Sequence, residues 1–130
     1  MAERGVIEHE ERARQIRDFS GLRYGNITPT DIDGLIDFKN RIFVVFELKY
    51  MDAQTPFGQH LAIERIVDIV QETGRVSIGI IGRHEHHDVN EPIDCANADL
   101  VEYRWLGEWR EPKRKITVKQ AIDKITEGLI

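Results

Sequence analysis

Two strand-like runs joined by three residues constrain the fold of this chain more than any other feature. The runs cover residues 32–38 and 42–50, and Lys39-Asn40-Arg41 connects them. The second run, IFVVFELKY, is dense in β-branched and aromatic residues, and its first half is apolar on both faces, which is typical of a strand covered on both sides. Because so short a connection suits a hairpin, we predict two antiparallel neighbours in a packed sheet.

The remaining pattern predicts a mixed α/β domain. Helices are expected over residues 7–19 and 57–73 and from Thr117 onward, and strands over residues 76–81 and 100–105. The middle helix is expected to have Thr55 as its N-cap and Pro56 in its first position, and to end at Gly74. The last helix carries a capping box of Thr117 and Gln120. We find no internal repeat or linker, so residues 1–130 are expected to form a single domain.

Composition narrows the class of protein. The chain has 23 acidic and 18 basic residues and a formal net charge of −5, which counts against a broad DNA-coating surface. A single cysteine, Cys95, allows neither an internal disulfide nor a cysteine-rich zinc site, and we expect it to be unreactive. No apolar run approaches the ~20 residues that span a bilayer, so a cytoplasmic protein without a membrane partner is expected.

The residues with most chemical information lie on the predicted hairpin. Glu47 and Lys49 are two apart on the second strand and therefore share one of its faces. If Phe38 pairs near Arg41, opposing positions sum to about 79, which places Asp33 opposite Phe46 and next to Glu47. Charges on so apolar a strand need a partner or a metal, and two carboxylates with several waters suit Mg²⁺. The alternative, an ordinary cross-strand ion pair on a surface hairpin, would contribute little.

The segment TPTDIDG (28–34), followed by FELK (46–49), resembles the PD-(D/E)XK nuclease superfamily, which includes restriction endonucleases, Holliday-junction resolvases and phage-type nucleases. This resemblance implies a mixed central sheet flanked by helices, a restriction-endonuclease-like core in the order αβββαβ. It covers roughly residues 7–82, with a C-terminal strand or hairpin and a helix added. A bacterial, archaeal or phage origin would suit such a protein.

The resemblance also implies roles for individual residues. Asp33 and Glu47 would bind the metal together with the backbone carbonyl of Leu48, and Lys49 would be the catalytic lysine. Asp31 has the same parity as Asp33 and could be the motif aspartate, although a turn residue is the plainer interpretation. Two accessory positions are weaker candidates, namely Glu10 in the first helix and Gln59 in the helix after the lysine.

Three further clusters have both a functional and a plain interpretation. The run from Arg83 to Asp88 contains three histidines, but its spacing matches no closed metal site, so a solvated loop is favoured. Trp105 and Trp109 flank a predicted hairpin turn, and packing is favoured over base stacking. A local basic cluster could follow a phosphate backbone or could be a solvated loop; its members are Arg110, Lys113, Arg114 and Lys115.

The sequence therefore predicts a metal-dependent endonuclease that hydrolyses phosphodiester bonds in DNA with Mg²⁺, for which Mn²⁺ would substitute. A chain this short has little surface for sequence reading, so recognition of branched DNA or ends, or a homodimer, is expected. Two alternatives stay open: a catalytically silent nuclease-fold module for DNA binding or assembly, and a hydrolase of nucleotides.

Overall fold

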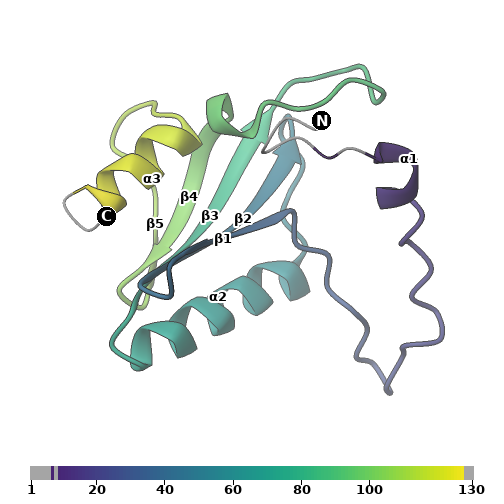
Figure 1. Ribbon diagram of the computed structural model, residues 1–130, viewed down its shortest axis with the longest axis horizontal. Helices are drawn as coiled ribbons and strands as arrows, with labels where there is room; N and C mark the ends of the chain where they lie inside the picture. Colours follow the sequence, from purple (N-terminus) through teal and green to yellow (C-terminus); the bar gives the residue numbers. More distant parts are fainter. Residues whose placement is uncertain (1–6, 8, 128–130) are drawn as a thin grey trace.

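The computed structural model describes residue 7 and residues 9–127. Along the chain it forms α1 (Glu10–Ala13), β1 (Gly34–Phe38), β2 (Ile42–Tyr50), α2 (Phe57–Glu72), β3 (Val76–His84), a short 3-10 helix η1 (Cys95–Asn97), β4 (Asp99–Trp105), β5 (Glu108–Arg110) and α3 (Val118–Thr126). The strands make one five-stranded sheet in the order β1-β2-β3-β4-β5. Figure 1 shows α2 on one face of this sheet and α3 on the other. The predicted mixed α/β class with helices flanking a central sheet is confirmed.

The sheet is mixed because one of its connections is a helical crossover. β1 and β2 pair antiparallel, as predicted for the hairpin. β2 and β3 are parallel, since α2 carries the chain back between them, and β4 and β5 add an antiparallel edge. The carboxyl ends of β2 and β3 therefore meet at one end of the sheet, next to the first turn of α2.

Successive residues of β2 supply two separate cores. Ile42 and Val44 pack with β3 and α3 on one face, whereas Val45 packs with Ile63 and Val67 of α2 on the other. A strand covered on both sides needs apolar residues at consecutive positions, which explains the unbroken apolar start of β2. Glu47 and Lys49 have the parity of Val45, so both lie on the face that α2 covers.

Several local predictions are confirmed. β2 has the predicted bounds. Thr117 and Gln120 form the capping box, and Gly74 follows α2 at φ +90°, where glycine avoids the strain of a side chain. The hairpin turn around Leu106 and Gly107 joins β4 to β5.

Other local predictions are wrong. The helix expected over residues 7–19 is limited to Glu10–Ala13, because its thin apolar stripe finds no core: Ile16 is 78% exposed. The first strand begins at Gly34, two residues late. Pro56, not Thr55, is the N-cap of α2, and no side chain caps that helix. In the described part of the chain, two strands stand between α1 and α2, where the order αβββαβ has three.

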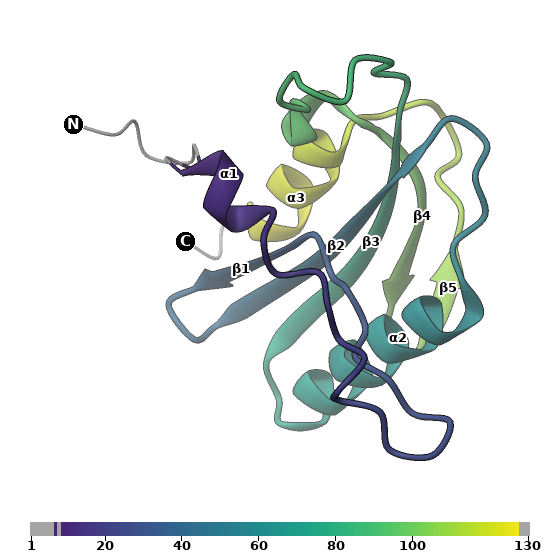
Figure 2. The same cartoon turned by 90° about the vertical axis from the view of Figure 1, so that its right-hand side faces the viewer.

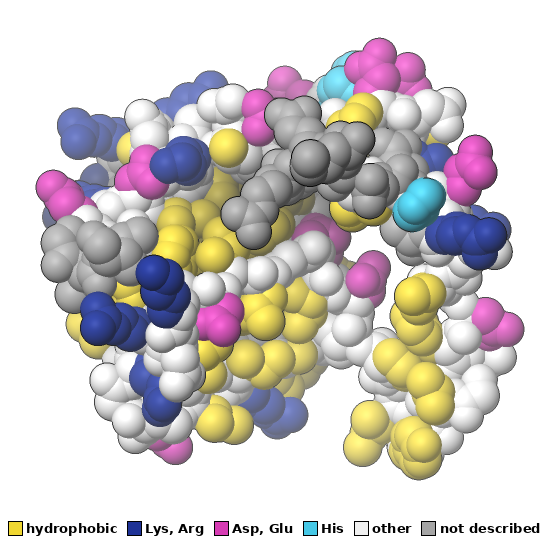
Figure 3. Space-filling view, in the orientation of Figure 1, with side chains coloured by type: hydrophobic (Ala, Val, Ile, Leu, Met, Phe, Trp, Pro, Cys, Tyr) yellow, Lys and Arg dark blue, Asp and Glu magenta, His cyan; other side chains and the backbone are white. Residues whose placement is uncertain are grey.

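The chain that follows α1 stands away from the sheet until it reaches Asp31, whose carbonyl accepts a hydrogen bond from Gln59. Figures 1 and 2 show it as an extended arm with α1 at its outer end, and Figure 3 shows hydrophobic side chains gathered on it. The exposed apolar residues in this part of the sequence include Ile16, Leu22, Tyr24 and Ile27. In the described residues, no helix has the length and apolar character needed to cross a membrane.

Gly79 tests how closely α2 packs on β3. A Cβ atom at this position would lie 2.6 Å from Ile63 Cγ2 and 3.2 Å from Val67 Cγ2. We expect Gly79→Ala to lower the free energy of unfolding by about 1–3 kcal/mol, because the added methyl overpacks the core.

Gly58 is the matched control, because it lies in the first turn of α2 and a Cβ there would meet nothing within 4 Å. Gly58→Ala should stabilise the helix by up to about 1 kcal/mol. Urea denaturation measures both variants, and equal effects would contradict this packing.

Candidate functional site

Asp33 and Glu47 lie side by side where β1 begins. Asp33 Oδ2 accepts a hydrogen bond from the Leu48 amide at 2.7 Å, and the Asp33 amide donates to Glu47 Oε2 at 3.1 Å. Two backbone-to-carboxylate bonds thus tie the residue before β1 to the end of β2. The structure brings together the two carboxylates that the sequence predicted to converge.

The pairing that does this differs by one residue from the predicted register. Phe38 pairs with Ile42 and Gly34 with Phe46, so opposing positions sum to 80 and Asp33 continues the register opposite Glu47. The predicted sum of about 79 had placed Asp33 opposite Phe46, and it is wrong because Arg41 joins the turn. The Arg41 carbonyl accepts from the Val76 amide of β3 instead.

Gly34 leaves room for the Phe46 ring on the neighbouring strand. A Cβ at Gly34 would lie 2.2 Å from Phe46 Cζ, so the Phe46 ring covers the space that a side chain would take. Any larger residue would move the ring or the strand. The Asp33-Gly34 pair therefore combines a carboxylate with the one residue type that lets β1 lie close against β2 here.

Lys49 completes the cluster through Gln59. Lys49 Nζ lies 3.2 Å from Glu47 Oε1 and donates to Gln59 Oε1 at 2.5 Å. Gln59 Nε2 in turn donates to Glu47 Oε1 at 2.9 Å and to the Asp31 carbonyl at 2.5 Å. Gln59 therefore joins the segment before β1, the end of β2 and the first turn of α2.

Burial and the charge of Lys49 act in opposite directions on the pKa of Glu47. The residue is 5% exposed, and this burial raises the pKa of its carboxyl group, with repulsion from Asp33 adding to the rise and Lys49 opposing it. A carboxylate buried at this depth is retained at a cost in stability. Such groups concentrate at functional sites.

The donor set fits a hard cation such as Mg²⁺. Two carboxylates are available, and the Leu48 carbonyl lies on the same edge of β2 as the amide that contacts Asp33, because both groups of one strand residue point to the same side. Among the described residues, no group of three or more His, Cys, Asp or Glu side chains could hold a metal. A cation here would take one or two carboxylates, a backbone oxygen and water, which is usual for Mg²⁺.

The three accessory candidates differ in whether the structure places them at the site. Asp31 is exposed and contributes its backbone carbonyl to Gln59. Glu10 belongs to α1, which stands apart from the sheet (Figure 1), and its side chain lies outside what the structure describes. Gln59 contacts Lys49, Glu47 and the Asp31 carbonyl.

The part of the basic cluster from Lys113 to Lys115 leads to the same end of the sheet as Lys49. Lys49 pairs with Arg83, Arg83 with Asp99, and Asp99 bridges to Thr117. Three strand spacings of about 4.8 Å separate Lys49 from Thr117, just after Lys113, Arg114 and Lys115. Lys113 and Arg114 are exposed, and Lys115 Nζ lies 3.8 Å from Asp99 Oδ2. Arg110 is held in β5 by Glu108 and the Trp105 carbonyl.

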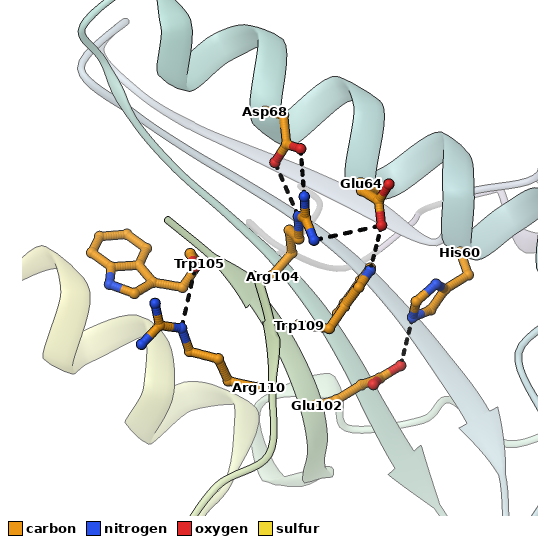
Figure 4. Close-up of polar contacts among 8 residues, drawn as sticks. All are labelled: His60, Glu64, Asp68, Glu102, Arg104, Trp105, Trp109 and Arg110. Atoms are coloured by element: carbon orange, nitrogen blue, oxygen red, sulfur yellow. Dashed lines mark hydrogen bonds and ion pairs between the residues drawn. The ribbon is translucent and has the colours of Figure 1, made fainter. Parts of the chain in front are cut away.

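Sequence reasoning missed a polar network between α2 and the last two strands (Figure 4). Arg104 forms a two-pronged contact with Asp68 at 2.6 and 3.0 Å. His60 Nε2 lies 2.8 Å from Glu102 Oε1, and its ring stacks on Trp109 at 3.9 Å. The signal was present, since ionisable residues recur at positions 60, 64 and 68 of the helix, four apart on one face.

The tryptophans and the histidine-rich loop are structural in their contacts. Trp105 packs against the core under α3 and Trp109 against the core under α2, in line with the predicted packing role. Tyr50 contacts the rings of His84 and His87, so the start of this loop folds back on β2. Burial, and then Asp33 and Asp94, raise the pKa of the Cys95 thiol, which favours its unreactive form.

Comparison with known proteins identifies no relative. No family model matches the chain, no curated protein matches it, and no solved structure matches it. The geometry alone therefore carries the functional argument.

The pKa of Glu47 offers a direct test of this geometry. We expect its carboxyl group to titrate above the ordinary value of 4.5. Asp33→Asn removes a repulsion and should lower this pKa, whereas Lys49→Met removes an attraction and should raise it further. Carbon-13 NMR of the Glu47 carboxyl measures this pKa in the natural chain and in both variants. An unchanged pKa in both variants would show that Asp33 and Lys49 do not interact with Glu47.

Proposed function

We propose that this protein is a Mg²⁺-dependent endonuclease that hydrolyses phosphodiester bonds in DNA. The observation that carries the proposal is the convergence of Asp33, Glu47 and Lys49 through direct contacts at the end of one strand. The restriction-endonuclease-like core belongs to the same proposal. The hairpin, the following helix and the parallel strand support it, and the count of two strands before α2 weighs against it.

Each residue has a defined task in this reaction. Asp33, Glu47 and the Leu48 carbonyl would hold Mg²⁺, which supplies Lewis-acid stabilisation of the phosphate and a more acidic bound water. Lys49, whose side chain is 14% exposed, is held at a fixed place by Glu47 and Gln59. Its ammonium group would orient the attacking water and stabilise charge that develops on the phosphate.

The surroundings of the site support a nucleic-acid substrate of limited extent. Arg83 lies beside Lys49, and the basic cluster continues along the same end of the sheet. With a net charge of −5, the chain lacks the positive excess of proteins that cover long stretches of duplex. Branched DNA or DNA ends are therefore the preferred substrates. A homodimer that presents two sites is the alternative arrangement for a chain of this size.

Replacement of the lysine should greatly lower the rate of DNA cleavage. We expect Lys49→Met to lower the rate of Mg²⁺-dependent cleavage of plasmid and branched DNA by about 10²–10⁴-fold. Lys124→Met is the matched control, because Lys124 is exposed on α3. This variant should cleave DNA as the natural chain does. Cleavage that persists unchanged in Lys49→Met contradicts the role proposed for the lysine. Absence of cleavage from the natural chain contradicts the endonuclease proposal and favours a catalytically silent module.

Metal binding is a separate expectation with its own measurement. Mg²⁺ or Mn²⁺ at about 100 times its dissociation constant should stabilise the natural chain by about 2.7 kcal/mol, seen as a rise in Tm. Glu47→Gln and Asp33→Asn should lose this rise, because each removes a charged ligand, whereas Lys49→Met should keep it. Equal rises in all four proteins would place the cation elsewhere.

A further inference from the structure

A pocket opens directly beside Lys49. It has a volume of about 460 Å³ and lies between the carboxyl ends of β2 and β3 and the first turn of α2. Lys49 and Arg83 contribute cationic side chains to its lining, and Asp52 and Glu102 contribute carboxylates. The apolar residues of the lining include Met51, Phe57, Ile81 and Val101. Its size falls within the range of small-ligand pockets, and its mixed lining is typical of them.

Arg83 has unused capacity to bind an anion. Its Nε atom is buried and finds no hydrogen-bond acceptor among the residues that the structure describes. The terminal nitrogens lie 3.5 Å from Asp52 and 3.7 Å from Asp99, at the long end of ion-pair distances. Arg83 also borders a second, smaller pocket. Because Arg83 pairs with Lys49 in the neighbouring strand, the pocket beside Lys49 has two cations side by side. A phosphate oxygen matches this arrangement.

The apolar part of the lining provides a surface for a base. Phe57 is the first residue of α2 and is 80% exposed, while Met51 and Val101 are 39% and 41% exposed. Ile81, which also lines the pocket, is buried. An aromatic ring this exposed contributes little to the core, but it can stack on a nucleobase of any sequence.

We propose that this pocket binds an unpaired nucleotide of the DNA strand, next to the phosphodiester bond that is cut. The base stacks on Phe57 over Ile81, and Arg83 holds a phosphate adjacent to the one at Lys49. A base inside a duplex must first leave its stack to enter such a pocket, and this cost is least for a base that is already unpaired. The inference rests on the proposed endonuclease function and specifies the substrate: DNA with an unpaired nucleotide at a branch or end.

The test measures binding without cleavage. Ca²⁺ replaces Mg²⁺, and 2-aminopurine is placed either at the unpaired position of a branched duplex or within a fully paired duplex of the same length. We expect the branched form to bind about tenfold more tightly, with fluorescence quenched by stacking, and Phe57→Ala to lose this preference. Phe57→Tyr should keep it. Arg83→Gln should weaken binding to both forms and reduce the dependence on salt by about one ion.

Ile69→Ala is the matched control, because Ile69 is 62% exposed on the same helix and does not line the pocket. It should bind as the natural chain does. A branched duplex that lacks only the unpaired base should lose the preference, and tight binding of that abasic form would overturn the inference. So would an unchanged preference in Phe57→Ala.

The two proposals fail in different ways. Preferential binding that depends on Phe57, without cleavage in Mg²⁺, refutes the endonuclease and supports the nucleotide pocket. Cleavage in Mg²⁺ that is indifferent to Phe57→Ala and to unpaired bases refutes the pocket and leaves the endonuclease standing.

Discussion

The buried carboxylate of Glu47 is the constraint on which the architecture of the site depends. A charge this far from water must be compensated by hydrogen-bond donors, and three groups supply them: the Asp33 amide, the Lys49 ammonium and the Gln59 side-chain amide. These donors come from the segment before β1, from β2 and from α2. The hydrogen bonds to this one carboxylate therefore fix the relative positions of three segments. The same hydrogen bonds bring the residues of the candidate site together.

The side chains of β2 change from apolar to charged along the strand. Its first half contributes to the core, and its second half contributes to the candidate site. Its first half supplies Ile42, Val44 and Val45 to the two cores. On the face toward α2, the apolar series then gives way to Glu47 and Lys49. Both side chains are largely buried, at 7% and 14% exposed, and electrostatic interactions there are stronger than at the surface.

The sequence was informative wherever structure depends on near neighbours. Residues 42–50 could be assigned as a strand because β-branched and aromatic side chains occupy six of the nine positions, and the Thr117–Gln120 cap needs only residues three apart. Glu47 and Lys49 could be placed on one face by parity alone. Asp33 could be placed near Glu47 only in approximate register, since the backbone of the turn decides the pairing.

What could not be predicted depends on tertiary partners. His60 and Glu102 are 42 residues apart, and nothing local indicates that they meet. The pairing of Gln59 with both Lys49 and the Asp31 carbonyl likewise requires the crossover of α2 to be known. The first helix failed for the opposite reason: residues 7–19 contain good helix formers, but short helices persist mainly when an apolar face is packed, and this segment has no such face.

The tight turn between β1 and β2 has an evolutionary consequence. Lys39 and Asn40 both have positive φ, at 53° and 66°, and Asn40 is held by a 2.7 Å hydrogen bond to Asp37. Because side chains alternate along a strand, a single inserted or deleted residue here would turn the whole of β1 over and carry Asp33 away from Glu47, while β2 to β5 kept their places. Descendants of this chain could thus lose the acidic pair through one change in loop length, without any mutation of the acids themselves.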